Sequence, residues 1–291
     1  MLSKLSVQNF RRVLDNPQLL KGEVSKTCLF VNKKIHSMAA SDSRFDVMAE
    51  DWDNLLILDG CRYDIFKKRN TIDGTLKRQT SPASQSLEFM KCNFFEREFH
   101  DTIYITANPF STEIKSGTFY KVVNLLDQWN EELQTVKPET VVESTLQISQ
   151  EYPDKRLLIH FMQPHYPFIG EKGKELSHRG YSPTKEGRKH SFSVWDELQY
   201  GVADYNLTQV IEAYEENLDI VLAHAEKLLG ELNGKSIVTS DHGNLLGERI
   251  KPIPIRVYGH PAGIRSSPLV DVPWLIVEGD RRDVTTEEPV G

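Results

Sequence analysis

The sequence predicts an α/β protein: a mostly parallel sheet sandwiched between helices, with polar residues at the carboxyl ends of the strands. Short apolar runs at 54–58, 102–106 and 156–161 have the length and composition of buried strands. Between such runs lie segments with helical spacing, the clearest at 205–232. Strands that alternate with helices at these intervals are typical of a parallel sheet covered on both faces.

The remaining elements follow in order along the chain. Residues 1–20 mix Leu, Val and Phe with Arg and Asp, which predicts a short amphipathic helix for a membrane surface, a partner or the domain itself. A charged helix is expected within 62–75, a polar loop at 80–86 with a helix from 87, a short element at 122–126, a helix at 138–151 and a surface loop or lid at 170–190. The predicted organisation is an N-terminal helical extension (1–50), a catalytic domain (51–280) and a flexible tail (281–291).

Bulk properties exclude several classes of protein. The 291 residues carry a formal net charge of −7, which argues against a nucleic-acid-binding protein. No apolar run approaches the roughly 20 residues that a transmembrane helix needs. The three cysteines, Cys28, Cys61 and Cys92, show no paired spacing, so we expect neither a disulfide framework nor a structural zinc site. The predicted location is cytoplasmic.

Two strand ends carry residues suited to a metal ion. The apolar run before Asp59 ends in Asp-Gly, and the run before Asp241 ends in Asp-His-Gly. A charged pair directly after a buried strand is costly unless something compensates, and a divalent cation does so. Carboxylate oxygens and the nitrogen of His242 are suitable ligands for Mn, Mg, Zn or Ca, among which these residues do not discriminate.

A loop rich in hydroxyl groups, Gln79 to Phe89, precedes a predicted helix. A Ser or Thr there, close to a metal ion and a helix N-terminus, could attack phosphorus or sulfur. The alternative is plain helix capping by Ser84 or Ser86.

Three histidines lie near the ends of predicted strands. His165 follows the 156–161 strand in a proline-rich loop and could contact an anionic substrate or protonate a leaving group. His260 precedes a proline after another proline-rich loop and could add a metal ligand or a substrate contact. His160, inside the strand, is interpreted as a histidine that bonds to the backbone.

The order of these features resembles the alkaline phosphatase superfamily, in particular its sulfatase-like branch of sulfatases, phosphoethanolamine transferases and lipoteichoic acid synthases. The resemblance covers about residues 50–278 and is carried by Thr-Ser-Asp-His-Gly at 239–243, the Tyr-centred helix before it, and Gln-Pro-His-Tyr-Pro-Phe at 163–168. It implies that Asp59, Asp241 and His242 are metal ligands. It also implies that His165 and His260 serve the substrate or a second metal ion.

The resemblance also bears on the nucleophile. Sulfatases use a cysteine in Cys-x-Pro-x-Arg, whereas the similar segment 80–84 contains neither Cys nor Arg. Aligning on the Glu-Phe that follows the catalytic Thr of the lipoteichoic acid synthases implies Ser84 as nucleophile and further metal ligand, with Thr80 and Ser81 as alternatives. Cys61 is interpreted as a packing residue.

The predicted function is therefore a metal-dependent hydrolase or transferase acting on phosphate or sulfate esters. The alternative is a non-catalytic metal- or ligand-binding protein on a degenerate sulfatase-like scaffold. The segment 170–190 contributes six cations, which suggests a small anionic ester or a polyol-phosphate or glycan substrate. These cations are Lys172, Lys174, Arg179, Lys185, Arg188 and Lys189.

Overall fold

A seven-stranded sheet forms the centre of the computed structural model, which describes residues 17–38, 45–176 and 193–290. The strand order is β2-β9-β6-β1-β5-β3-β4. Strands β6, β1, β5, β3 and β4 run parallel, and β9 is antiparallel to both of its neighbours. The predicted α/β fold with a mostly parallel sheet is therefore confirmed. The strands are β1 (Asn54–Leu58), β2 (Thr75–Thr80), β3 (Phe99–Thr106), β4 (Phe119–Asn124), β5 (Arg156–Phe161), β6 (Ser236–Thr239) and β9 (Asp271–Val277).

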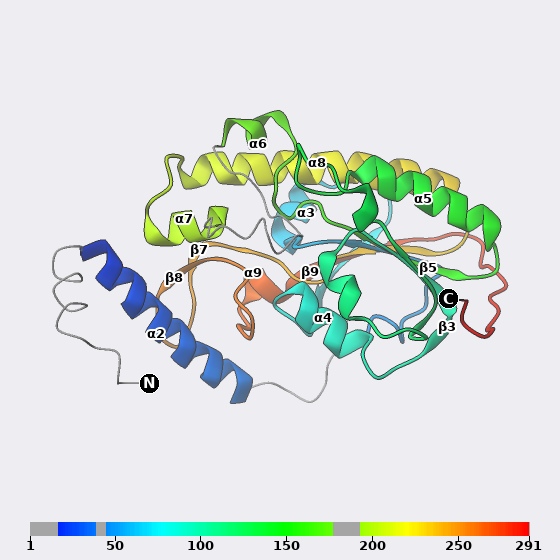
Figure 1. The fold of residues 1–291 in the computed structure, drawn as a ribbon, viewed down its shortest axis with the longest axis horizontal. Helices are drawn as coiled ribbons and strands as arrows, with labels where there is room; N and C mark the ends of the chain where they lie inside the picture. The colour runs from blue at the N-terminus through cyan, green and yellow to red at the C-terminus, as the bar shows by residue number, and fades with distance from the viewer. Residues whose placement is uncertain (1–16, 39–44, 177–192, 291) are drawn as a thin grey trace.

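Helices cover both faces of this sheet (Figure 1). Helices α3, α5 and α8 lie on one face, and α4 lies on the other. A short α6 rests on α8, and α7 packs against the small β7–β8 sheet. The helices are α2 (Pro17–Met38), α3 (Tyr63–Arg69), α4 (Ser86–Asn93), α5 (Pro138–Glu151), α6 (Glu171–Glu175), α7 (Val194–Tyr200), α8 (Leu207–Glu231) and α9 (Ser267–Val270), with 3-10 turns η1 (Pro109–Glu113) and η2 (Leu126–Gln128).

The alternation of side chains along β1 explains why the sheet has a core on each face. Successive residues of a strand point to opposite sides. Leu56 and Leu58 join the cluster beneath α5 and α8, whereas Leu55 and Ile57 join the cluster around α4. All four side chains are fully buried. A central parallel strand therefore contains an unbroken apolar run, which made it recognisable in the sequence.

A second, two-stranded sheet lies beside the main one and is formed by β7 (Leu245–Arg249) and β8 (Arg256–Gly259). The amide of the fully buried Asn32 anchors α2 to this hairpin, because it donates to the Ile253 carbonyl and accepts from the Ile253 N–H, both at 2.9 Å. His36 adds a hydrogen bond of 2.8 Å to the Lys251 carbonyl. Helix α2 is thus attached to the domain through specific polar contacts.

Some predicted elements fall on residues that the structure describes only in part. Residues 1–16 and 177–192 lie outside the described residues, and with them most of the predicted N-terminal helix and lid. Lys172 and Lys174 of the lid segment form ion pairs with Glu212 and Glu171. At the other end, where the sequence predicts a flexible tail, Thr285 accepts a 3.0 Å hydrogen bond from the buried Lys155 ammonium.

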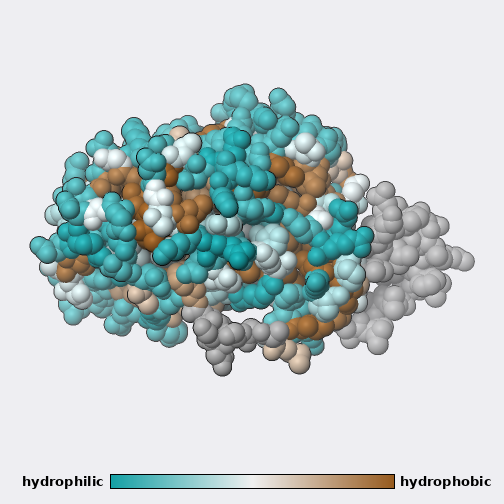
Figure 2. Space-filling model, turned by 180° about the vertical axis from the view of Figure 1, so that it is seen from behind, coloured by the Kyte–Doolittle hydropathy of each residue, from teal (hydrophilic) through white to brown (hydrophobic). Residues whose placement is uncertain are grey.

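The face of the molecule opposite the view of Figure 1 is mainly hydrophilic. Figure 2 shows the back face, on which polar residues surround smaller apolar areas. Within the described parts of the chain, no helix combines the length and hydropathy that crossing a membrane requires.

Candidate active site

Three adjacent strands bring four polar side chains to one edge of the sheet. Asp59 directly follows β1, and Asp241 and His242 follow β6. His160 occupies the penultimate position of β5, opposite Ile57 of β1. Because β1 lies between β5 and β6 and all three run parallel, their carboxyl ends meet at the same place. We call Asp59, His160, Asp241 and His242 the carboxylate centre.

The side chains of the carboxylate centre converge on one point. The Nε2 atom of His242 lies 3.6 Å from Asp59 Oδ1 and 3.6 Å from Asp241 Oδ2. The Nε2 atom of His160 lies 3.8 Å from Asp59 Oδ2 and 4.0 Å from Asp241 Oδ2. One ligand atom each of Asp59, His160 and Asp241 lies within 4.8 Å of the others.

Each residue of the centre keeps one buried polar atom without a hydrogen-bond partner among the described residues: Asp59 Oδ1, His160 Nε2, Asp241 Oδ2 and His242 Nε2. Buried polar atoms are nearly always satisfied, so four orphans at one point call for a shared partner. Two carboxylate oxygens and two imidazole nitrogens form a donor set that divalent metal ions accept. The residues present therefore fit a divalent cation.

The electrostatics of the centre favour the same conclusion. Burial, and then the charge of Asp241, raises the pKa of Asp59 well above its usual range. Burial would also raise the pKa of Asp241, but His242 and His160 outweigh this effect and lower it. Burial lowers the pKa of His160 to about 4, so its imidazole is neutral and keeps a nitrogen lone pair. Two acidic groups in one buried space need compensating positive charge.

Hydrogen bonds orient both imidazoles. His242 Nδ1 donates to the Gly243 carbonyl at 2.7 Å, which leaves the lone pair on Nε2, toward the carboxylates. His160 Nδ1 pairs with the Tyr104 hydroxyl at 2.9 Å. Support of this kind from a second layer of residues is typical of histidines that bind metals.

A second set of hydrogen bonds holds the two half-sites together at the Gly60 turn. Gly60 has a φ of +68°, and a Cβ there would lie 2.9 Å from Asn244 Nδ2, so the turn requires glycine. Its carbonyl accepts from the Tyr214 hydroxyl at 2.8 Å and from Asn244 Nδ2 at 2.9 Å. Its N–H donates to Asp241 Oδ1 at 3.0 Å. The turn therefore links the end of β1 to the loop after β6.

Buried Arg62 reinforces this link. Its guanidinium donates to the Asn244 carbonyl at 3.1 Å and forms ion pairs with Glu248 at 2.6 Å and Asp64 at 2.8 Å. These carboxylates outweigh the effect of burial and raise the pKa of Arg62 above its usual value. The neighbouring Cys61 is fully buried, which agrees with a packing role.

The serine side chains of the loop Gln79 to Phe89, the hydroxyl loop, have different hydrogen-bond partners. The Ser84 hydroxyl donates to Glu88 at 2.7 Å and accepts from the Gly263 N–H at 2.8 Å, which occupies it away from the carboxylate centre. Ser81 donates to the Asp241 carbonyl, and Thr80 is the last residue of β2. Ser86, the first residue of α4, donates to Asp59 Oδ2 at 3.2 Å. The structure thus brings Ser86 to the centre and leaves Ser84 outside it.

His165 and His260 face each other beside the centre, with their Nε2 atoms 2.9 Å apart. His165 Nδ1 donates to the Tyr166 carbonyl, so a neutral His165 accepts at Nε2 and His260 donates. The His260 ring lies 4.7 Å from that of His242, centroid to centroid. Burial, together with His242 and His165, lowers the pKa of His260 well below its usual value.

Four residues near the centre were not among the predicted site residues: His160, Ser86, Asn108 and Asn244. Asn108 donates to Asp59 Oδ2 at 2.7 Å from the loop after β3. Its position directly after a predicted strand was a usable signal, as was the position of Asn244 next to Asp-His-Gly. His160 carried no such signal, because a histidine inside an apolar run is usually a core residue.

A pocket of about 190 Å³ opens over the centre; we call it the inner pocket. Asp59, Ser86 and Asn108 form its polar side, together with His165 and His260. Its apolar side consists of Pro109, Phe110, Trp129, Met162, Tyr166 and Pro167. A small concave site with a few convergent polar groups is typical of a ligand-binding site.

Comparison with solved structures shows a similar fold, whereas comparison of the sequence finds no related family or protein. No model of a known protein family matches the chain, and no curated protein sequence matches it. The integral membrane lipooligosaccharide phosphoethanolamine transferase A from Neisseria meningitidis is similar with a TM-score of 0.50 and 12% identity. That match covers 84% of this chain and 53% of the Neisseria chain, so this chain spans about half its length.

Two further solved structures are similar at lower scores. The C-terminal periplasmic domain of phosphoethanolamine transferase EptC from Campylobacter jejuni has 12% identity over 78% of each chain and a TM-score of 0.44. A protein of the alkaline phosphatase superfamily from Vibrio parahaemolyticus has 12% identity over 87% of this chain and 69% of that one, with a TM-score of 0.41. The predicted resemblance to the sulfatase-like branch is confirmed as a resemblance of fold, and the predicted cytoplasmic location finds no support.

Proposed function

We propose that this chain is a metal-dependent hydrolase or transferase of phosphate esters that uses Ser86 as its nucleophile. One observation carries the proposal: the Ser86 hydroxyl contacts a buried carboxylate centre with four ligand atoms unpaired among the described residues, and Ser86 and Asp59 both line a pocket. Such a combination of nucleophile, metal-binding donors and concave site is the pattern expected of a metal-assisted transfer centre. The fold shared with phosphoethanolamine transferases agrees with it.

Asp59, Asp241, His242 and His160 would hold the cation. When bound, the cation supplies positive charge to the phosphoryl oxygens and favours the ionised form of the hydroxyl. Two imidazole nitrogens in the donor set favour Zn²⁺ or Mn²⁺ over Ca²⁺ and Mg²⁺, which prefer oxygen ligands. His160 thereby joins the predicted ligands Asp59, Asp241 and His242. We assign His260 to the substrate side, next to His165.

Ser86 is the preferred nucleophile because of its surroundings. Its hydrogen bond to Asp59 directs the Oγ atom toward the carboxylate centre, and it stands at the first turn of α4, where free N–H groups favour negative charge. Ser84 was the residue that the sequence favoured for this role. Its bonds to Glu88 and Gly263 instead serve to shape the loop.

The His165–His260 pair would serve the leaving group. When the Ser86 oxygen bonds to phosphorus, its proton passes to Asp59 Oδ2, which accepts its hydrogen bond, and the bond to the leaving oxygen breaks. The His165–His260 pair at the wall of the inner pocket would hydrogen-bond to the leaving oxygen, which takes its proton from water. Water or an acceptor alcohol would then release the phosphoryl group from Ser86. The proposed substrate is a small anionic ester, a polyol phosphate or a glycan.

The identity of the nucleophile provides the test. Ser86→Ala is expected to lower the turnover of a bis-aryl phosphodiester by several orders of magnitude, the scale seen when catalytic nucleophiles are removed. Rapid quench with substrate should place a phosphoryl adduct on the peptide that contains Ser86. Ser84→Ala in the same loop is the matched control. An adduct on Ser84, Thr80 or Ser81 would transfer the role to that residue, and an aldehyde at Cys61 would refute the mechanism.

The non-catalytic alternative makes a different prediction for the same samples. It expects metal uptake and thermal stabilisation without turnover of phosphate monoesters, diesters or sulfate esters. Under that alternative, Ser86→Ala would bind metal as the wild type does, and neither protein would turn over any of these esters.

A further inference from the structure

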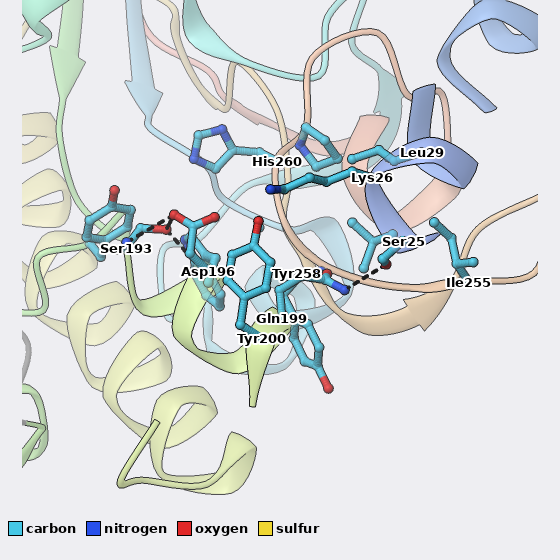
Figure 3. A pocket seen from close by; sticks show the side chains of 15 residues that line it. Ser25, Lys26, Leu29, Ser193, Asp196, Gln199, Tyr200, Ile255, Tyr258 and His260 are labelled. Carbon is cyan, nitrogen blue, oxygen red and sulfur yellow. Dashed lines mark hydrogen bonds between the residues drawn. The ribbon is translucent and has the colours of Figure 1, made fainter. Parts of the chain in front are cut away.

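A second cavity, of about 330 Å³, also has His260 in its lining (Figure 3). We call it the outer pocket. Its walls come from three elements far apart in the sequence: α2, α7 and β8. Helix α2 contributes Ser25, Lys26 and Leu29, and α7 with its cap contributes Ser193, Trp195, Asp196, Gln199 and Tyr200. The volume falls in the range of small-molecule sites.

The outer pocket is continuous in its lining with the inner pocket. Tyr166 and His260 line both cavities. The side chains of His260 and Tyr166 therefore stand between the two pockets, so a substrate whose phosphate lies at the carboxylate centre would pass them to reach the outer pocket. Binding energy from such a non-reacting part of a substrate orients the reacting part.

The lining of the outer pocket combines aromatic rings with hydrogen-bonding groups. Tyr166, Trp195, Tyr200 and Tyr258 supply the rings. The Trp195 indole is 5% exposed and contributes to the wall of the pocket. Ser25, Lys26 and Gln199 supply hydrogen-bonding groups. Aromatic faces beside such groups suit a hydroxyl-rich ligand.

Lys26 gives the pocket a positive charge. In Figure 3 its side chain extends from α2 over the pocket in the direction of His260. Its Nζ lies 5.5 Å from the centre of the Tyr200 ring, a cation–π contact that holds the ammonium at the rim. Ser25, one residue before it, accepts a 3.2 Å hydrogen bond from Gln199 of α7, which fixes the spacing of the two helices.

We propose that the outer pocket binds the polyol or sugar part of a phosphate ester, and that Lys26 donates a hydrogen bond to a hydroxyl oxygen of that part. The inference rests on the proposed function, because it takes the ester's phosphate to lie at the carboxylate centre. It makes α2 a part of the substrate site, whereas the sequence predicted only an extension preceding the catalytic domain.

The test measures binding rather than turnover. Glycerol 3-phosphate and inorganic phosphate are titrated by calorimetry into the full chain carrying Ser86→Ala, which removes the proposed chemistry. The wild-type pocket should bind glycerol 3-phosphate more tightly than inorganic phosphate. Adding Lys26→Ala should weaken glycerol 3-phosphate binding about tenfold, the scale of one lost charged hydrogen bond. Lys26→Arg should restore part of the affinity.

Two companion variants separate the pocket from general effects on α2. Trp195→Leu removes an aromatic ring from the wall, and should reduce the preference for glycerol 3-phosphate over inorganic phosphate. Lys34→Ala removes an exposed lysine that stacks on Phe30 of the same helix and should change neither affinity.

The inference is overturned if glycerol 3-phosphate and inorganic phosphate bind equally, or if Lys26→Ala leaves the affinity for glycerol 3-phosphate unchanged. Failure here is distinct from failure of the proposed function. A wild-type enzyme that turns over aryl diesters, with Lys26→Ala binding glycerol 3-phosphate normally, would keep the catalytic role and refute the pocket.

Discussion

The carboxylate centre and the outer pocket meet at His260, but different kinds of structure hold them. Asp59, His160 and Asp241 extend from β1, β5 and β6, whose neighbouring residues are fully buried and paired on both sides. The outer pocket is assembled from α2, α7 and a two-stranded sheet, joined by a few side-chain hydrogen bonds such as those of Asn32 and Gln199.

This difference suggests that the carboxylate centre and the outer pocket have different roles. Residues at the ends of central parallel strands are positioned to within small limits because the sheet fixes them, which suits metal binding and bond breaking. Peripheral elements with few contacts can vary without disturbing the core, which suits the choice of substrate. Mutations should therefore affect catalysis and metal binding on one side of His260, and ligand preference on the other.

The largest effect is expected from Asp241→Ala. The substitution removes one of the two buried carboxylates of the centre and leaves His242 and His160 without it. We expect the turnover of an aryl phosphodiester to fall by at least about 10³-fold. Bound metal should fall to background by elemental analysis. Asp219→Ala, which breaks a surface ion pair with Arg69, is the control. Full activity in Asp241→Ala would refute the metal-centre assignment.

A smaller effect is expected from His160→Gln, since three of the four proposed ligands stay. Loss of one ligand should weaken metal binding by about 10- to 100-fold, comparable to changes in the groups around metal ligands. The measurement is a competitive titration against a chelator of known affinity. Thermal stabilisation by added metal should shrink in parallel, because a ligand bound only to the folded state at free concentration c stabilises it by RT ln(1 + c/Kd), which falls as Kd rises. Unchanged metal affinity would reduce the centre to Asp59, Asp241 and His242.

Tyr214→Phe tests the turn that joins the two half-sites. The fully buried hydroxyl donates to the Gly60 carbonyl and accepts from the Arg62 N–H at 3.0 Å. Its removal leaves the Arg62 N–H unsatisfied and the Gly60 carbonyl with Asn244 alone, and should cost about 1–3 kcal/mol of unfolding free energy. Turnover should fall about tenfold through misplacement of Asp59. Tyr205→Phe, which loses a hydroxyl bonded to Glu197 near the start of the same helix, should keep its turnover. Equal turnover losses in the two variants would contradict a positioning role for Tyr214.

The smallest effect is expected from Asn32→Ala, on the peripheral side of the comparison. It removes the two hydrogen bonds between α2 and the loop at Ile253. Hydrogen exchange should show faster opening of α2, with a loss of about 1–3 kcal/mol of local stability, while β1 keeps its protection. Metal affinity should not change. Simultaneous loss of protection in β1 would show that the two regions form one cooperative unit.

The sequence located correctly the elements whose apolar pattern follows from burial. Some of them are buried on one face and others on both faces. The run 54–58 has no polar interruption because β1 is covered on both sides, and the stripe within 205–232 recurs at 3.6 residues because one face of α8 is buried. The sequence placed Asp59, Asp241 and His242 at strand ends for a related reason: a charged residue after such a run stands out against it. Strand β2 carries no comparable pattern, because it is an edge strand with mainly exposed side chains.

The direction in which each loop side chain points was decided by the tertiary structure. Ser84 and Ser86 differ in sequence by two positions and in chemistry not at all, yet one bonds to Glu88 and the other to Asp59. Likewise, His160 is indistinguishable in sequence from a core histidine until β1 and β6 bring two carboxylates beside it. Local patterns record burial and periodicity, which are properties of one segment. The convergence of Ser86 and His160 on the carboxylate centre, and the place of Lys26 in the outer pocket, depend on strand order and helix placement. Both bring together residues that are far apart in the sequence.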